Sequence, residues 1–300
     1  MSIVVVGSVG IDTIETPFGR EERVLGGSAS YFSLAACNFT DIHMVSSVGE
    51  DFPREYYDLL VLKGINTEGV AEEKGETFRW EGKYDYDMKD PETVSVTLGV
   101  LGSFDPIVPK NLRGADYLFL ANTAPEVQMK VLEQMSSPRI VACDTMNFWI
   151  ENRPDKLKEL LAKVHVLIIN DSEARQLSEE SMMAKAAKKI IDMGPEFLIV
   201  KRGEYGALLF SREELFFAPS YMLERVLDPT GAGDTFAGGF MGYMASHSEK
   251  PNFASFKKAV AYGSVLASFT VENFSVKGLC SLGEEQIEQR YREFLKLLAI

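Results

Sequence analysis

Short apolar runs alternate with helix-like patterns along most of the chain. The runs are continuous and rich in Val, Ile and Leu, which is typical of strands covered on both faces. The predicted strands lie at 3–6, 43–48, 117–120, 140–143, 166–169 and 198–200, and the predicted helices between them at 28–37, 54–63, 126–135, 155–162 and 182–193. Further helices are predicted at 234–246, 253–271 and 284–298. This alternation predicts βαβ units and an α/β fold with a largely parallel sheet.

Two stretches, 13–25 and 76–101, depart from this rhythm. Both alternate polar and apolar residues, which is typical of antiparallel strands with one solvated face. A parallel core does not need them. They could form a small separate sheet that covers a pocket as a lid, or edge hairpins without a function, and the pattern alone leaves both open.

Length and charge narrow the class of protein. The 300 residues, 46% hydrophobic and 25% charged, suit two globular domains or one large α/β domain with an inserted lid. The net charge of −13 repels phosphate backbones and anionic lipid, so we expect neither nucleic acid nor membrane as a partner. A small anionic ligand held by a local group of N–H donors is still compatible with this charge.

The cysteines and histidines carry no recognisable metal or disulfide pattern. Cys37, Cys143 and Cys280 are far apart, without C-x-x-C spacing, and the three histidines are scattered. The apolar runs are shorter than the ~20 residues that span a bilayer, and no signal peptide is apparent. We therefore expect a reduced, cytoplasmic setting.

The strongest chemical motif opens the predicted helix at 234–246. Small residues at 231–233 leave consecutive N–H groups unhindered at a helix start, where anions bind. Asp234 follows in the first turn, and by itself it could merely cap the helix. Gly238, Gly239 and Gly242 argue for a close approach to the helix backbone, because each costs about 1 kcal/mol relative to Ala.

A carboxylate beside such an anion site suits phosphoryl transfer. The carboxylate can accept the proton of an attacking hydroxyl, while N–H groups stabilise the charge on the phosphoryl oxygens. The motif is neither a Walker A loop nor a dinucleotide fingerprint.

Two further polar groups of residues follow predicted strands. Asn170-Asp171-Ser172-Glu173 comes after the strand at 166–169, where oxygen ligands for Mg²⁺ would be well placed. The alternative is an ordinary helix cap at Asn170 or Ser172. Asp12, with Gly26-Gly27 before the next helix, could receive substrate hydroxyls, or these residues could form a plain strand–turn–helix junction.

Taken together, these residues resemble the ribokinase-like (PfkB-type) carbohydrate kinase family. The motifs occur in family order over essentially the whole chain: Gly26-Gly27, Val48-Gly49-Glu50-Asp51, Asn170-x-x-Glu173, Val200-Lys201-Arg202-Gly203 with Gly206-Ala207, and the signature Asp228-Pro229-Thr230-Gly231-Ala232-Gly233-Asp234-Thr235-Phe236.

The resemblance implies a ribokinase-like α/β fold in one kinase domain over residues 1–300. It implies a mostly parallel central sheet flanked by helices, with a small β lid formed by about 13–25 and 76–101. The implied activity is ATP-dependent phosphorylation of a hydroxymethyl group on a sugar or sugar derivative. Alternatives are a nucleoside kinase of the same family and a non-catalytic nucleotide- or sugar-binding sensor.

The resemblance also assigns roles by position. It implies that Asp234 is the catalytic base and that Gly231, Ala232 and Gly233 form an anion hole. The acceptor would be bound by Asp12, Gly26 and Gly27, and Mg²⁺ would be arranged by Asn170 and, through water, by Glu173. The ATP phosphates or ribose would lie near Arg202 and Gly203, and the adenine would be flanked by Gly263 and Asn273. A monovalent cation near Asp228 and a homodimer through the lid occur in parts of the family and are left open.

Some positions depart from family members with known acceptors. In ribokinases an Asn follows four residues after the second glycine of the pair and helps to hold ribose, whereas Tyr31 stands there in this chain. Asn147 and Arg153 are further candidates for contacting the acceptor. The aromatic residues Tyr31, Trp80, Phe148 and Trp149, together with Arg79, would suit a nucleobase. They are more often plain packing, so a sugar is favoured slightly over a nucleoside.

Overall fold

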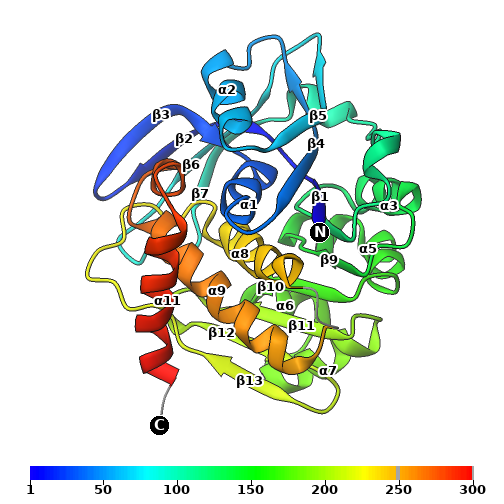
Figure 1. The fold of residues 1–300 in the computed structure, drawn as a ribbon, viewed down its shortest axis with the longest axis vertical. Coiled ribbons are helices and arrows are strands. Elements are labelled where there is room, and N and C mark those ends of the chain that lie inside the picture. The colour runs from blue at the N-terminus through cyan, green and yellow to red at the C-terminus, as the bar shows by residue number, and fades with distance from the viewer. Residues whose placement is uncertain (248–250, 299–300) are drawn as a thin grey trace.

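The computed structural model describes residues 1–247 and 251–298 and is built around a nine-stranded sheet. The strand order is β13-β12-β11-β10-β9-β8-β1-β4-β5, and the sheet is parallel from β5 through β11 and antiparallel at β12 and β13 (Figure 1). The strands are β1 (Ser2–Val6), β4 (Asp41–Gly49), β5 (Asn66–Glu73), β8 (Tyr117–Leu120), β9 (Ile140–Cys143), β10 (Val166–Asn170), β11 (Phe197–Lys201), β12 (Ala207–Phe210) and β13 (Leu215–Ala218).

Helices cover both faces of this sheet, because successive strand residues point to opposite sides. In β1, Ile3 and Val5 pack in one core cluster and Val4 and Val6 in another. The first cluster lies under α1 (Ser28–Ala36), α8 (Ala232–Ser246), α9 (Phe253–Val271) and α11 (Glu284–Leu298); the second lies under α3 (Pro125–Gln134), α5 (Pro154–Leu161), α6 (Asp171–Ser178) and α7 (Met183–Asp192). The predicted α/β fold with a mostly parallel, helix-flanked sheet is confirmed.

The remaining helices are short or peripheral. They are α2 (Arg54–Leu62), α4 (Asn147–Asn152) and α10 (Lys277–Cys280), with single 3₁₀ turns at Gly99–Ser103, Lys110–Leu112 and Gly203–Tyr205. None of the helices in the described part of the chain combines the length and the apolar character needed to cross a bilayer.

A second, four-stranded sheet has the order β3-β2-β6-β7 and lies beside the main sheet (Figure 1). It contains β2 (Gly10–Thr16), β3 (Gly19–Gly26), β6 (Phe78–Lys83) and β7 (Glu92–Thr97). Hairpins β2–β3 and β6–β7 are antiparallel as the sequence predicts, but the central pair β2–β6 is parallel. The reason is that β2 and β6 follow closely on the carboxyl ends of β1 and β5, so both leave the main sheet in the same direction.

Candidate active site

The chemistry-bearing residues are gathered at the carboxyl ends of the parallel strands. Asn170 ends β10, Lys201 ends β11 beside it, and Asp144 directly follows β9 on the other side of β10. The amino end of α8 and the start of the small sheet meet the same edge, bringing in Asp234 and Asp12. This edge is where ligands bind in open α/β sheets.

The start of α8 has the geometry of an anion site. Gly231 is its N-cap with φ +72°, and a Cβ there would lie 2.3 Å from the Tyr31 ring, so this position requires glycine. The Ala232 N–H donates to Pro229 O, and the Thr235 N–H to Gly231 O. Among the described residues, the N–H groups of Gly231 and Gly233 have no acceptor, which leaves them available to an anion, whereas the Asp234 N–H donates to its own carboxyl.

Asp234 is the third residue of α8, and its carboxyl accepts a hydrogen bond from its own backbone N–H. An acidic side chain in the first turn also stabilises the helix dipole, so the structure is compatible with both the capping and the catalytic interpretation. Burial raises the pKa of Asp234 to about 6, and the charge of Lys201 acts in the opposite direction. The carboxyls of Asp144, Glu173 and Asp12 also face this group. Asp234 can thus be ionised at neutral pH and still accept a proton.

Asn170 and Glu173 form a reciprocal cap at the start of α6. Asn170 Oδ1 accepts from the Glu173 N–H at 2.8 Å, and Glu173 Oε2 accepts from the Asn170 N–H at 2.8 Å. The helix-cap alternative for Asn170 is therefore present. It leaves one carboxylate oxygen of Glu173 outside the cap, and burial raises the pKa of this side chain.

The donor set fits a magnesium ion that arrives with a nucleotide. Within residues 1–247 and 251–298, no group of three or more His, Cys, Asp or Glu side chains forms a metal cage. Mg²⁺ bound to ATP keeps several waters and phosphate oxygens and needs only one or two protein carboxylates. Glu173 and the buried Asp144, whose Oδ1 has no hydrogen-bond partner, supply oxygen donors of that kind.

The expected acceptor residues lie together where the small sheet joins the main one. Asp12 is only 3% exposed and its Oδ1 has no hydrogen-bond partner. Burial, with the charges of Asp228 and Asp234, raises its pKa to about 8, while the Gly27 N–H lowers it. A Cβ at Gly26 would lie 1.9 Å from Asp12 Oδ2, and one at Gly27 (φ +94°) 2.4 Å from Ser8 O. The glycine pair thus lets the carboxyl approach the backbone closely.

Tyrosines connect this region with the anion site. The Tyr31 ring packs on Gly231 and is buried near Asp12 and Asp228. Tyr84, just after β6, accepts a hydrogen bond at 3.1 Å from Thr230 Oγ1. The small sheet is therefore joined to the loop that leads into α8.

Asp228 organises that loop. It is 1% exposed and accepts from the Thr230 N–H and the Ser275 N–H, each at 2.8 Å. Burial raises its pKa, and these hydrogen bonds lower it. The monovalent cation expected near Asp228 stays a prediction.

The residues expected near ATP are spread around the anion site. Arg202 and Gly203 begin the turn between β11 and β12, with the Arg202 guanidinium 5.8 Å from the Tyr205 ring centre. Gly263 packs against α8, where a Cβ would lie 2.8 Å from Phe236 O. Asn273 follows the carboxyl end of α9.

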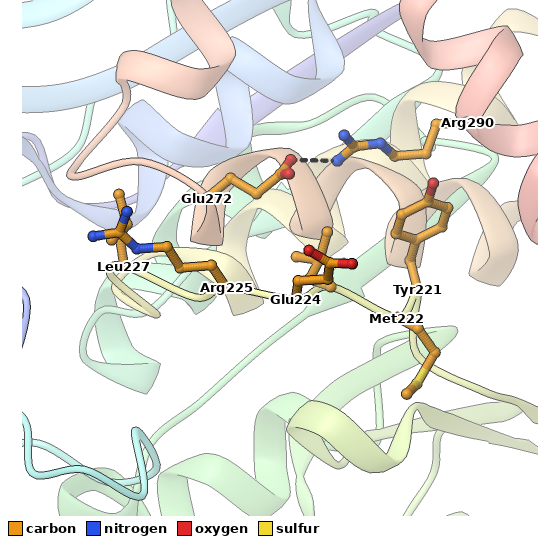
Figure 2. A pocket seen from close by; sticks show the side chains of 8 residues that line it. Tyr221, Met222, Glu224, Arg225, Leu227, Glu272 and Arg290 are labelled. Atoms are coloured by element: carbon orange, nitrogen blue, oxygen red, sulfur yellow. Dashed lines mark hydrogen bonds and ion pairs between the residues drawn. The ribbon is translucent and has the colours of Figure 1, made fainter.

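A cavity of about 460 Å³ adjoins this end of α9. It is lined by the segment 221–225, Leu227, Glu272 and Arg290, and Figure 2 shows Arg290 paired with Glu272 near Tyr221. Leu227 and Glu272 directly precede Asp228 and Asn273 in the chain.

The remaining candidates already have protein partners. Asn147 donates to Gln176, Arg153 pairs with Glu126 at 3.4 Å, and Trp149 donates to Asn122 Oδ1. Arg79, on β6, pairs with Asp51 after β4. Of the aromatic candidates, Phe148 is 52% exposed.

Sequence reasoning assigned no role to Lys201 or Asp144, which the structure brings into the same group as Asp234 and Glu173. Lys201 stands inside a motif already quoted, and Asp144 directly follows a predicted strand. Both residues could have been recognised as site candidates because each directly follows a predicted strand.

The sequence of this chain is similar to those of known proteins over most of its length. A family model described as pfkB family carbohydrate kinase matches residues 2–280. Cytidine kinase of Thermococcus kodakarensis is 30% identical over 248 residues, covering 80% of this chain and 87% of that protein. Nucleoside kinase of Methanocaldococcus jannaschii is 22% identical over 266 residues, covering 87% and 82%.

Solved structures share the fold over nearly the whole chain. An E. coli protein assigned as a ribokinase II and solved with ATP and Mg²⁺ has a TM-score of 0.80 at 17% identity, covering 97% of this chain and 99% of its own. Nucleoside kinase of Burkholderia thailandensis in complex with inosine has a TM-score of 0.76 at 18% identity, covering 98% and 99%.

Proposed function

Because this chain belongs to the pfkB family of carbohydrate kinases, it is a phosphotransferase with an alcohol group as acceptor; we propose that it transfers the γ-phosphoryl group of ATP to a hydroxymethyl group, with Asp234 as the general base. The supporting observation is the position of the Asp234 carboxyl in the first turn of α8, beside the unbonded N–H groups of Gly231 and Gly233. The family also favours an enzyme over a non-catalytic sensor.

The proposed step uses few groups of this chain. Asp12 orients the acceptor hydroxyl, and Asp234 takes its proton as the new P–O bond forms. The bond from the γ-phosphorus to the bridging oxygen breaks, and the electron pair leaves with ADP. The N–H groups of Gly231 and Gly233 stabilise the charge on the phosphoryl oxygens, whereas the Ala232 N–H already donates to Pro229 O. Mg²⁺, held near Asn170 and Glu173, would neutralise part of the triphosphate charge.

The same proposal assigns the nucleotide to the region around Arg202, Gly203, Gly263 and Asn273, and the lid role to the small sheet. The sequence-expected lid segments, 13–25 and 76–101, largely coincide with that sheet (β2–β3 and β6–β7).

For the acceptor, we propose a ribonucleoside, with cytidine first. The cytidine kinase and two archaeal nucleoside kinases match 80%, 87% and 86% of this chain. Deoxyribokinase and ribokinase relatives match only 37% and 43% of it, and an inositol 3-kinase that matches 90% is 24% identical, against 30% for the cytidine kinase. The exposed Phe148 beyond β9 would also suit a base, whereas the Tyr31 ring is buried against Gly231. This reverses the slight preference for a sugar that the residues alone gave.

The substrate proposal is tested by ADP release with Mg·ATP and a panel of cytidine, uridine, adenosine, inosine, ribose, fructose and myo-inositol. We expect the highest kcat/KM with cytidine. Turnover of ribose or fructose above every nucleoside would overturn the nucleoside assignment and leave the kinase assignment standing. No turnover with any acceptor, although ATP binds, would contradict the catalytic proposal.

The role of the base is tested with Asp234→Asn. We expect kcat to fall at least ~100-fold, the usual scale for a lost general base, with calorimetric binding of a non-hydrolysable ATP analogue nearly unchanged. The wild-type kcat should decline as pH falls through about 6, where Asp234 takes up a proton. Asp155→Asn is the matched control, because Asp155 is an exposed first-turn carboxylate of α5. Near-normal turnover in Asp234→Asn would remove the base from the proposal.

A further inference from the structure

Lys201 reaches from the end of β11 to the backbone at the start of α8. A Cβ built on Gly233 would lie 2.7 Å from Lys201 Nζ, 3.5 Å from Cε and 3.8 Å from Cδ. The whole outer half of the side chain therefore lies along the anion site, and its ammonium is next to one of the two unbonded N–H groups.

Three carboxyl groups lie close enough to this ammonium for its charge to act on them. The charge of Lys201 lowers the pKa of Asp144, Glu173 and Asp234, each of which burial raises. Within residues 1–247 and 251–298, however, Lys201 forms no direct ion pair or hydrogen bond with any of them. The Lys201 ammonium is therefore near several carboxylates but is not ion-paired with any of them.

Asp144 gives an independent sign that the region is built for a ligand. Its side chain is 5% exposed, and its Oδ1 has no hydrogen-bond partner in the described structure. Buried polar atoms are almost always paired, so an unpaired carboxylate oxygen beside an unpaired ammonium indicates that a partner is missing. A phosphate group with its metal ion would bring a partner for both charges.

We propose that Lys201 is a further catalytic residue, whose ammonium binds the oxygens of the transferring phosphoryl group at the start of α8. This inference rests on the proposed function and adds to it a charge that the N–H groups alone do not supply. Lys201 stays protonated throughout, while the acceptor proton goes to Asp234 and the bridging electron pair to ADP.

The physical advantage is the location of the charge. Charge in phosphoryl transfer is spread over the three equatorial oxygens, and a preorganised cation there stabilises the transition state. Lysine suits the task because its ammonium is a compact charge on a flexible stem, which can leave the carboxylates when the phosphate arrives. Arg202, the next residue, lies beyond the end of β11, so the two basic residues are not equivalent.

The test compares Lys201→Met with Lys201→Arg and the control Lys185→Met, which removes an exposed charge on α7. We expect Lys201→Met to lower kcat at least ~100-fold. It should weaken binding of a non-hydrolysable ATP analogue about tenfold by calorimetry, while ADP binding changes less than about twofold, because ADP lacks the transferring group. Lys201→Arg should recover only part of kcat, since its planar fork has a different geometry.

Gly233→Ala provides a second variant that keeps the lysine. Gly233 is not in the left-handed region, and the added methyl meets only the flexible tip of Lys201, so the fold should survive while the ammonium is displaced. It should reproduce the selective loss of analogue binding. Equal loss of ADP and analogue binding, or an altered pH profile with unchanged analogue affinity, would overturn the assignment. A wild type that turns over no acceptor would refute the proposed function, whereas the analogue-to-ADP comparison would still test Lys201.

Discussion

The buried carboxyl of Asp12 is expected to bind the acceptor, but its burial lowers the stability of the folded protein at neutral and higher pH. Asp12 lies almost fully inside the protein, and its pKa is raised from 3.8 to about 8. The folded state therefore holds a proton that the unfolded chain releases above pH 4. Stability is greatest at low pH for this group and declines as pH rises toward 8. A sugar or nucleoside hydroxyl would satisfy Asp12 Oδ1, which has no hydrogen-bond partner among the described residues.

We predict that Asp12→Asn stabilises the protein and weakens the acceptor site. Asn keeps the shape and the Gly27 contact but cannot ionise, so the variant should gain at least ~2 kcal/mol over wild type at pH 8 and much less at pH 5. Urea unfolding at the two pH values measures this, and acceptor KM should rise. Asp155→Asn, an exposed counterpart, should change neither. Parallel pH curves for wild type and Asp12→Asn would show that Asp12 is not buried with a raised pKa.

Among the elements, the small sheet is tied to the catalytic loop through one tyrosine. Tyr84 packs with Ile14 and Val24 on the inner face of the sheet, and its hydroxyl accepts from Thr230, one residue before Gly231. At the opposite end, the Asp51 carboxylate accepts from the Thr77 N–H at 2.7 Å as β6 begins. The sheet is thus held at its base by Asp51 and at its inner face by Tyr84.

Tyr84→Phe should remove the hydrogen bond to Thr230 and leave the packing of the ring in its core cluster unchanged. The ring stays in its cluster, and the lost hydrogen bond costs about 1 kcal/mol. We expect KM for the acceptor to rise about fivefold, the equivalent of that energy, with kcat little changed. Steady-state kinetics measures this against Tyr86→Phe, whose ring is 86% exposed. An identical KM in the two variants would contradict a role for this contact in covering the acceptor.

Elements with strong local patterns were predictable from the sequence, whereas weakly patterned edges were not. The buried strands β1, β8, β9, β10 and β11 are continuous apolar runs, and the structure matches them within a residue or two. β5 escaped prediction because it is a polar, half-exposed edge strand. The hairpin of β12 and β13 was missed because β13 is a largely exposed edge strand and no helix separates it from β12. The parallel pairing of β2 and β6 depends on where β1 and β5 end in the main sheet, and the local sequence pattern does not contain that information.

The same distinction holds for the site. Gly231, Gly233 and Asp234 predict an anion site from the local sequence, because this spacing of glycines and an acidic residue at a helix start is typical of few other structures. Lys201 and Asp144 carry no such signal: each is a single residue at a strand end. They become neighbours only because β10 lies between β9 and β11 in the sheet order. Order within a sheet is a property of the whole fold, which a reading along the chain cannot supply.

At the scale of the whole molecule, the active site lies between two sheets that are buried from solvent to different extents. The central strands of the main sheet are covered on both faces, and residues 118–120 are fully buried. The small sheet buries only part of its surface, and every residue of β7 is exposed. Amides in such a one-sided sheet open at a lower free-energy cost than those of a two-sided core. Ligands that join the small sheet to the α8 loop would raise this cost.

Hydrogen exchange should therefore respond to ligands in two separable steps. A non-hydrolysable ATP analogue with Mg²⁺ should slow exchange at the start of α8 and leave β2, β3, β6 and β7 largely unchanged. Adding the acceptor should slow exchange across those four strands several-fold, because the lid then closes on a filled pocket. The main-sheet strands β1, β8 and β10 serve as internal controls, since their amides are already protected. In Asp12→Asn the first step should persist and the second weaken. Acceptor-dependent protection confined to α1 and α8, with none in the small sheet, would show that this sheet is a fixed wall and not a lid.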